Sequence, residues 1–476
     1  MRPRINIWRW GRIVLAGAAA AAFAAALWTR WLPVKKLFRT QAASDLLALC
    51  TEFSLGAGAA LLGILLVTLL FGRFYCSVLC PLGILQDVMS LFRFRRHYRY
   101  TGWKNKVRRV VFFVVAGMAL SGFMLPLILL LPSSNFVSML NAFGRVAGER
   151  LGFGARLVGW GMFVLLFVSV LWKGRLFCNT LCPVGALLAL CSKTSRYRIV
   201  LDAEKCVRCG ACEKVCKSTC IDSANKSVNT DECVMCMNCL GSCRLGAISI
   251  KKQPFRVCEN LPERREFLKD AGLLGGGIAV GVLGRLTGNR CEKYPVMPPG
   301  AGSFDRFTSR CVGCGLCIAA CKGKVLKPAM TEYGLRGFLQ PVLDPVKGAC
   351  DFNCAKCTHI CPCGALTPLK LAEKRRTRIG LAVYEAKLCV AYADGEDCGA
   401  CAEHCPVGAL EMVAYKDTMI PKVNKDLCIG CGACQNICPV RPQAAISVVG
   451  VSVQTVVDKP LETKSKKLSA EADFPF

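Results

Sequence analysis

Apolar residues in this chain are gathered into blocks instead of being dispersed among polar ones. Four apolar runs are each close to the ~20 residues that a helix needs to cross a lipid bilayer. They lie near residues 13–28, 46–71, 107–131 and 157–172. Cysteine-rich sequence follows at 199–255 and 300–450, and the polar tail at 451–476 is expected to be disordered. The pattern predicts a four-helix membrane bundle over residues 1–198, followed by two cysteine-rich units.

Basic residues predict which way the bundle faces. Four arginines precede the first apolar run, and Lys and Arg are dense between residues 73 and 109. Loops rich in Lys and Arg stay on the cytoplasmic side of a membrane, and the opposite side carries fewer (Lys35, Lys36 and Arg39). We therefore expect four spans that return the chain to the cytoplasm, which places residues 199–255 there.

Cysteine spacing indicates the chemistry of both units. Four segments repeat CxxCxxCxxxC, in which three thiolates wrap one corner of an iron–sulfur cubane and the fourth reaches the other cluster of a pair. They are Cys206, Cys209, Cys212 and Cys216; Cys233, Cys236, Cys239 and Cys243; Cys311, Cys314, Cys317 and Cys321; and Cys428, Cys431, Cys434 and Cys438. A zinc site would use a CxxC pair but not the third and fourth cysteines at these intervals. We expect α+β ferredoxin domains of the bacterial two-[4Fe–4S] type.

Two looser variants lie between the last two regular motifs. They are Cys350, Cys354, Cys357 and Cys361; and Cys389, Cys398, Cys401 and Cys405, which has a loop inserted after its first cysteine. Six motifs account for 24 of the 34 cysteines, so six [4Fe–4S] clusters are expected, with iron as the metal. We expect Cys220, Cys258, Cys291 and Cys363 to be unligated thiols, although Cys220 and Cys363 are close enough in sequence to compete as ligands.

The exchange of fourth cysteines suggests which motifs share clusters. In the first unit, Cys216 and Cys243 are each expected to bind the cluster that the other motif holds with its first three cysteines. In the second unit the motifs could nest, outer with outer and inner with inner, because the two irregular motifs are adjacent. The cysteines that change places would then be Cys321 with Cys438, and Cys361 with Cys405. Consecutive pairing is the alternative.

A second cysteine pattern repeats inside the bundle. GRFYCSVLCPLG at 72–83 matches GRLFCNTLCPVG at 174–185. Two thiols four residues apart on a helix share a face. The four cysteines are therefore expected to converge on one redox site, either a metal centre or a dithiol: Cys76, Cys80, Cys178 and Cys182. The alternative is that Gly-Arg and Cys-Pro only shape two equivalent helix ends.

Glu52 is a candidate catalytic residue, as a group that could accept a proton at the membrane surface. It lies seven residues after Asp45, on the same helical face, at the start of the second apolar run. Carboxylates at membrane depth are functional candidates by default. The alternative is an interfacial carboxylate that headgroups solvate or that pairs with Lys35 or Lys36.

Residues 260–290 contain a twin arginine followed by a glycine-rich apolar run. ERREFLK at 263–269 is typical of export signals for proteins that cross a membrane already folded, although Glu263 replaces the usual serine or threonine. A fifth span here would carry residues 300–476 to the periplasm, and a surface or re-entrant helix is the alternative. The glycines are expected to pack against helices and not to form a nucleotide site, because no strand precedes them.

Composition excludes other functions. The chain has three histidines, none of them in an apolar run, and no CxxCH motif, which excludes attached c-type haem and a bis-histidine haem in the bundle. The net charge of +30 counts every cysteine as neutral, and six thiolate-ligated clusters would lower it to about +18. Much of the remainder is the arginine beside the apolar runs, so no nucleic-acid partner is expected.

Together these motifs resemble a known pair of subunits. The spans, the CxxxCP motifs and the following cluster pair of residues 1–250 resemble NapH, and the twin arginine and four clusters of residues 260–450 resemble NapG. The chain thus resembles a fusion of these two quinol dehydrogenase subunits, which serve periplasmic nitrate reductase. The resemblance implies a bacterial inner-membrane protein that passes electrons from the quinone pool to a periplasmic cytochrome or terminal reductase.

Two other functions remain open. CcoG relatives reduce copper for oxidase assembly and share the CxxxCP core, which would make this protein a metal reductase or cofactor-maturation factor. That interpretation leaves the four extra clusters without a use. The other possibility is a non-enzymatic electron wire within a larger respiratory complex, in which another subunit oxidises quinol.

Overall fold

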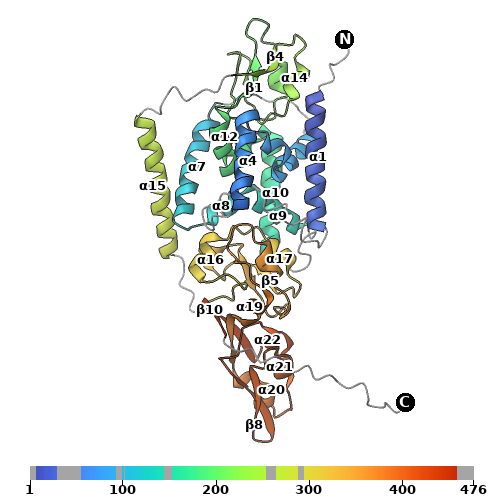
Figure 1. The fold of residues 1–476 in the computed structure, drawn as a ribbon, viewed down its shortest axis with the longest axis vertical. Coiled ribbons are helices and arrows are strands. Elements are labelled where there is room, and N and C mark those ends of the chain that lie inside the picture. The colour runs from blue at the N-terminus through green and yellow to red at the C-terminus, as the bar shows by residue number, and fades with distance from the viewer. Residues whose placement is uncertain are drawn as a thin grey trace, which may run out of the picture.

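The computed structural model describes residues 7–28, 55–92, 99–100, 102–143, 153–253, 264–287 and 294–457. Among these residues, five long helices run side by side along the long axis of the molecule (Figure 1). They are α1 (Ile7–Trp28), α4 (Leu55–Phe71), α7 (Lys104–Leu120), α10 (Phe153–Lys173) and α15 (Arg264–Thr287). One cysteine-rich unit lies at each end of this bundle. We call residues 197–253 the small unit and residues 294–457 the large unit.

Two helices in the described part of the chain are long and apolar enough to cross a membrane. The segments are Arg156–Lys173 in α10 and Arg265–Gly284 in α15. Only 17% and 11% of these segments are buried, so their apolar side chains form outer surface instead of a protein core. Leu157 and Leu283, for example, are 61% and 60% exposed. Uncovered apolar helix surface of this kind suits contact with lipid.

The third apolar run is not one helix, contrary to the prediction for residues 107–131. Helix α7 ends at Leu120, and the chain turns at Gly122, whose φ of 81° is left-handed. The N–H of Phe123 then donates to the carbonyl oxygen of Met118 at 2.9 Å, which is typical of a glycine-terminated helix. Two shorter helices follow, at the end of the bundle nearest the large unit: α8 (Leu125–Leu130) and α9 (Pro132–Ala142).

Two pairs of short helices follow α4 and α10 on the side of the small unit. They are α5 (Tyr75–Val78) with α6 (Pro81–Met89) and η2 (Ser90–Phe92), and α11 (Leu176–Thr180) with α12 (Pro183–Ser192). A proline begins the second helix of each pair. Proline is tolerated in the first turn of a helix but not in its interior, so the chain starts a new helix at this residue. The repeat in the sequence is therefore also a repeat in the structure.

The small unit is built on two antiparallel strand pairs and two short helices. The elements are β1 (Tyr197–Leu201) with β4 (Ile248–Lys252), β2 (Ile221–Asp222) with β3 (Ser227–Val228), α13 (Ala211–Lys214) and α14 (Asn238–Ser242). Leu201 lies opposite Ile248 in the first pair. The unit is fixed to the bundle by Lys104 of α7, which donates to the carbonyl oxygen of Ser218 at 3.1 Å.

The large unit has two halves, one next to the bundle and one beyond it (Figure 1). The first contains α16 (Phe304–Arg310), α17 (Leu316–Ala320), β5 (Leu326–Pro328), η4 (Gly334–Gly337), β6 (Pro341–Leu343), α18 (Lys356–Ile360) and α19 (Leu371–Arg376). The second contains β7 (Thr377–Tyr384), η5 (Ala386–Leu388), α20 (Val390–Ala393), α21 (Ala400–Glu403), β8 (Leu410–Tyr415), β9 (Thr418–Val423), α22 (Ala433–Ile437) and β10 (Ile446–Val456). The strands form the antiparallel pairs β5–β6, β8–β9 and β7–β10.

Strand β10 corrects the expected polar tail at residues 451–476. It continues to Val456, which lies opposite Thr377 of β7. The unit also begins before residue 300, because Val296 and Met297 are 4% and 0% exposed. Residues 458–476 lie outside the described part of the chain.

Glycines allow α15 to pack closely on α7. A Cβ atom on Gly277 would lie 2.5 Å from the carbonyl oxygen of Val114, and one on Gly281 would lie 3.1 Å from the Cα of Met118. Small residues four apart let helices approach in this way within membranes. The expectation that the glycines of this run pack against a helix is confirmed for Gly277 and Gly281, whereas nothing lies within 4 Å of a Cβ on Gly272, Gly275 or Gly276. Helix α15 runs along the bundle from one unit to the other (Figure 1).

Replacing Gly281 by leucine should weaken the packing of α15 on α7. The added side chain would need space that Met118 and Ser121 occupy, and overpacking of this kind costs about 1–3 kcal/mol. We expect Gly281→Leu to lower the unfolding temperature of the full chain in detergent. Gly276→Leu is the matched control, since nothing lies within 4 Å of a Cβ at that position. An equal loss of stability in both variants would contradict the packing.

Candidate functional site

The four regular cysteine motifs share one backbone conformation. In each, both residues that flank the second cysteine have positive φ. They are Arg208 and Gly210, Met235 and Met237, Gly313 and Gly315, and Gly430 and Gly432. Such residues turn successive N–H groups towards one point and create a concavity that suits an anion. Arg208, Met235 and Met237 adopt this conformation although it is unfavourable for residues with a Cβ atom.

Three cavities in the large unit are each lined by four cysteines. Each cavity combines the first three cysteines of one motif with the fourth cysteine of its neighbour. The sets are Cys350, Cys354 and Cys357 with Cys321; Cys428, Cys431 and Cys434 with Cys405; and Cys389, Cys398 and Cys401 with Cys438. The remaining set is Cys311, Cys314 and Cys317, and the charge of Cys361 acts on all three of these thiols.

The nested pairing is therefore wrong, and the motifs of the large unit pair consecutively. Cys321 lines the cavity of Cys350 where nesting required Cys405, and Cys438 lines the cavity of Cys389 where nesting required Cys361. Helix α17 packs on α18 and α21 packs on α22, so each pair of cavities forms between neighbouring motifs. Pairing neighbours closes shorter loops, which costs less chain entropy.

The small unit has a cavity with five cysteines. Cys233, Cys236 and Cys239 line it together with Cys216, as the exchange of fourth cysteines predicted, and Cys220 lines it as well. The Sγ atoms of Cys216 and Cys220 lie 3.5 Å apart. The hydrogen bond between them lowers the pKa of Cys216 to about 7, against the opposing effect of burial.

Cys363 occupies a comparable place in the large unit. Its Sγ lies 3.8 Å from that of Cys361, and this hydrogen bond lowers the pKa of Cys361 to about 7. The N–H of Leu366 also donates to the Cys361 sulfur at 3.4 Å. Both fourth cysteines are thus predisposed to the thiolate form that binds iron.

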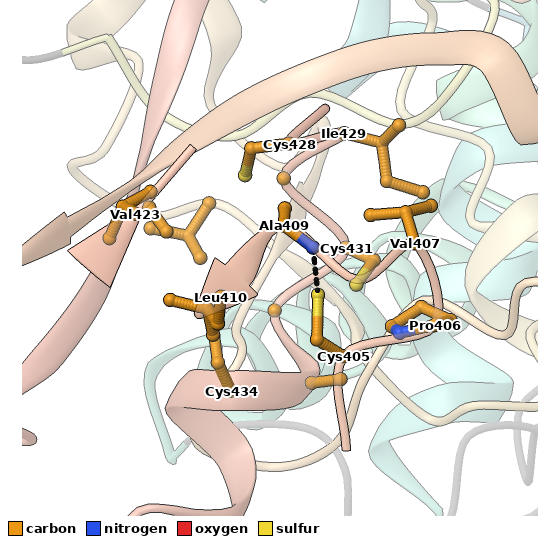
Figure 2. Close-up of a pocket in the computed structure, with 15 residues that line it drawn as sticks. Cys405, Pro406, Val407, Ala409, Leu410, Val423, Cys428, Ile429, Cys431 and Cys434 are labelled. Atoms are coloured by element: carbon orange, nitrogen blue, oxygen red, sulfur yellow. Dashed lines mark hydrogen bonds between the residues drawn. The ribbon is translucent and has the colours of Figure 1, made fainter. Parts of the chain in front are cut away.

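Cysteines and apolar residues alone form the walls of the cavity of Cys428. Figure 2 shows Cys405, Cys428 and Cys431 around a common space with the apolar side chains of Val407 and Ile429 beside it. The dashed line marks the N–H of Ala409, which donates to the sulfur of Cys405 at 3.2 Å. Four sulfurs, apolar walls and N–H donors to sulfur fit a [4Fe–4S] cluster, whose potential depends on such hydrogen bonds.

The four cysteine sets of the large unit lie in a line that leads away from the bundle. At the bundle, the Oγ of Ser134 donates to the carbonyl oxygen of Val312, next to Cys311, at 2.8 Å. Between the two halves, the N–H of Cys350 donates to the carbonyl oxygen of Cys431 at 2.9 Å. Helices α20 and α21, which carry the set of Cys389 and Cys401, lie in the far half (Figure 1).

The CxxxCP cysteines lie on two turns with equivalent geometry, and not on one helical face as expected. Cys76 lies in α5 and Cys178 in α11, whereas Cys80 and Cys182 are the N-cap residues of the helices that follow. Their ψ angles are both 116°, because the next residue is proline. All four are buried in the same apolar core, and the structure brings them together by a different route from the one predicted.

Two buried arginines join the repeats, because each donates to a backbone carbonyl oxygen of the opposite repeat. Arg73 of the first repeat donates to the carbonyl oxygen of Cys178 at 2.9 Å, and Arg175 of the second donates to that of Cys76 at 2.9 Å. Gly83 and Gly185 leave no space for a Cβ beside these same carbonyls. The repeated Gly-Arg and Pro-x-Gly sequence is thereby explained.

Asp87 connects the repeats to the first long helix and to the small unit. Its carboxylate lies 3.0 Å from Arg12, 2.9 Å from Arg175 and 3.3 Å from Lys217. Burial alone would raise the pKa of Asp87, but these three cations lower it to about 2. No motif marks Asp87 in the sequence, although it is the only carboxylate between Glu52 and Glu149.

Other predicted groups lie outside the described residues or do not form single-ion sites. Glu52, Asp45, Cys258 and Cys291 belong to the undescribed parts of the chain. Within the described ranges, no three His, Cys, Asp or Glu side chains are arranged to hold one metal ion. This result includes the cysteine sets, whose side chains line the cavities described above.

Four family models match the chain. A model described as "4Fe-4S binding domain" matches residues 53–99, 156–199 and 357–378, which include both CxxxCP motifs. A "4Fe-4S dicluster domain" model matches residues 396–441. Two further "4Fe-4S binding domain" models match residues 197–218 and 308–331.

Curated relatives match about two fifths of the chain. Ferredoxin-type protein NapG of Escherichia coli (strain K12) is 34% identical over 210 residues, which are 40% of this chain and 87% of that protein. Methylamine utilization ferredoxin-type protein MauM of Methylobacillus flagellatus is 34% identical over 208 residues, 40% of this chain and 84% of that protein. Putative electron transport protein YccM of Escherichia coli is 28% identical over 220 residues, 45% of this chain and 60% of that protein.

No solved structure matches the chain. The cysteine sets of the large unit, the matching cluster-binding domains and the nearly complete coverage of NapG agree with one another. The chain therefore belongs to the family of ferredoxin-type iron–sulfur electron-transfer proteins that includes NapG and MauM.

Proposed function

We propose that this protein is a membrane-bound component of a quinol dehydrogenase, which takes electrons from quinol and delivers them through [4Fe–4S] clusters to a periplasmic acceptor. The observation that carries the proposal is the placement of two cluster-binding units at opposite ends of one helix bundle (Figure 1). Oxidation of one quinol releases two electrons and two protons, and each cluster carries one electron at a time. The acceptor is a cytochrome or a terminal reductase.

Six clusters are assigned to the six cysteine sets. Those of the small unit use Cys206, Cys209, Cys212 and Cys243, and Cys233, Cys236, Cys239 and Cys216. Those of the large unit use Cys311, Cys314, Cys317 and Cys361; Cys350, Cys354, Cys357 and Cys321; Cys428, Cys431, Cys434 and Cys405; and Cys389, Cys398, Cys401 and Cys438. The linear order of the last four provides a path from the bundle to the far end of the large unit.

The membrane topology follows from charge and helix direction. Five spans, formed by the five long helices, would hold the protein in the bacterial inner membrane, in contact with lipid and the quinone pool. The dense Lys and Arg between residues 73 and 109 favour the cytoplasm for the small unit. Helix α15 would then take the large unit to the periplasm, since it runs along the bundle from one unit to the other.

The ligand assignment makes a paired prediction at Cys361 and Cys363. Cys361→Ala should remove one cluster, a loss of about four iron atoms per chain. Cys363→Ala is the matched control, because its sulfur lies only 3.8 Å from that of Cys361 but is assigned no iron. Iron and acid-labile sulfide per anaerobically purified chain are the measurements. Loss of a cluster in Cys363→Ala alone would reverse the assignment.

The topology predicts which unit a protease reaches. In intact spheroplasts, added protease should cleave residues 300–476, while residues 199–255 should be cleaved only after lysis. Antibodies against each unit would follow the fragments. Protection of residues 300–476 in spheroplasts would place the large unit in the cytoplasm and rule out a periplasmic acceptor.

Quinol oxidation predicts that the clusters are reduced from the membrane. A menaquinol analogue added to membranes should produce the EPR signals of reduced clusters. Glu52→Gln should slow this reduction about 100-fold, the usual effect of losing a general base, with Asp45→Asn as the control carboxylate. An unchanged rate in Glu52→Gln would end the role of Glu52, and no reduction in the native protein would end the quinol proposal.

A further inference from the structure

Four buried cysteines inside the bundle belong to none of the six cluster sets. We propose that Cys76, Cys80, Cys178 and Cys182 together hold a seventh iron–sulfur cluster. All four are 4–5% exposed, and each lies close enough to at least two of the others for their charges to interact. The inference rests on the proposed function in one respect, since the six other clusters are the partners with which this one would exchange electrons.

The cationic charge around these thiols favours an anionic group. Arg73 and Arg175 are 0% and 2% exposed. Arg175 pairs with Asp87, but within the described residues Arg73 has no carboxylate at ion-pair distance and bonds only to uncharged oxygens. A buried cation is destabilising unless a counter-charge lies nearby. The charges that act on Arg73 come from Glu232, which is beyond ion-pair distance, and from the thiols Cys178 and Cys233. A cluster with four thiolates supplies about two negative charges beside Arg73.

The backbone near these thiols donates a hydrogen bond to sulfur, as it does at the ligands of the other clusters. The N–H of Gly185 donates to the sulfur of Cys182 at 3.3 Å, as the N–H of Ala409 does to Cys405 at 3.2 Å. Four cysteine sulfurs are the ligand set that [2Fe–2S] and [4Fe–4S] clusters use, which makes such a cluster the class of metal group proposed here. A purely structural role explains the glycines and arginines of the repeat but gives no reason for four converging sulfurs.

The position of the site suggests what the cluster would do. One continuous apolar core contains the four cysteines together with Cys236 of the small unit and Cys311 of the large unit. A cluster at this place would accept one electron from a reduced neighbour in one unit and pass one electron to an oxidised neighbour in the other. It would connect electron-transfer groups that the bundle otherwise separates.

The test compares iron content in matched cysteine variants of the full chain, purified without oxygen. The double variant Cys80→Ala with Cys182→Ala should lose about four iron atoms per chain, or about two for a [2Fe–2S] cluster, and keep the EPR signals of the six other clusters. Cys191→Ala is the control, since Cys191 is a half-buried cysteine of α12 outside the set. Iron content equal to the control would overturn the proposal.

A second variant covers the case in which the double variant fails to fold. Cys178→Ser keeps a ligand of similar size and should retain the iron while shifting the EPR signal and lowering the reduction potential of one cluster only. A spectrum and titration identical to the native protein would overturn the proposal. Quinol-dependent reduction is measured separately: if it fails while the seventh cluster is present, only the proposed function is lost.

Discussion

The exchange of two buried arginines between the CxxxCP repeats is the interaction around which the molecule is arranged. Each guanidinium bonds to the carbonyl oxygen of the first cysteine in the opposite repeat. Removing either arginine would leave buried carbonyl groups without donors, which costs about 1–3 kcal/mol for each group. Arg73 also bonds to the carbonyl oxygen of Asp231 at 3.2 Å, so the same contact that joins the repeats positions the small unit.

Features that depend on local spacing could be predicted from the sequence. The CxxCxxCxxxC motifs imply loops that direct three sulfurs to one point. The residues on either side of Cys209 and of Cys314 have positive φ, which gives the backbone of these loops the turn that this requires. The placement of Cys216 with Cys233, Cys236 and Cys239 could be predicted because the small unit contains only two motifs. In the large unit, spacing alone left nested and consecutive pairing open. The packing of α17 on α18 and of α21 on α22 decides between them.

Features that depend on a single backbone turn or on distant charges could not be predicted. An apolar run looks like one helix until Gly122 turns the chain, and Cys76 and Cys80 look like neighbours on a helix until Pro81 starts a new one. Asp87 has no motif around it, since its partners Arg12, Arg175 and Lys217 come from three separate parts of the chain. A carboxylate isolated among apolar residues was the one available signal.

Helix α15 shows how one segment can satisfy two requirements at once. The twin arginine and the weakly apolar, glycine-rich run suit an export signal for a folded domain, which a unit that carries preassembled clusters needs. The same glycines give α15 a flat face against Val114 and Met118 of α7, while Val280 and Leu283 remain 53% and 60% exposed. In the membrane placement proposed above, apolar burial would supply little attraction between helices, and close contact at glycine would hold this weakly apolar helix in place. A segment with the composition of a leader can therefore remain as a permanent part of the bundle.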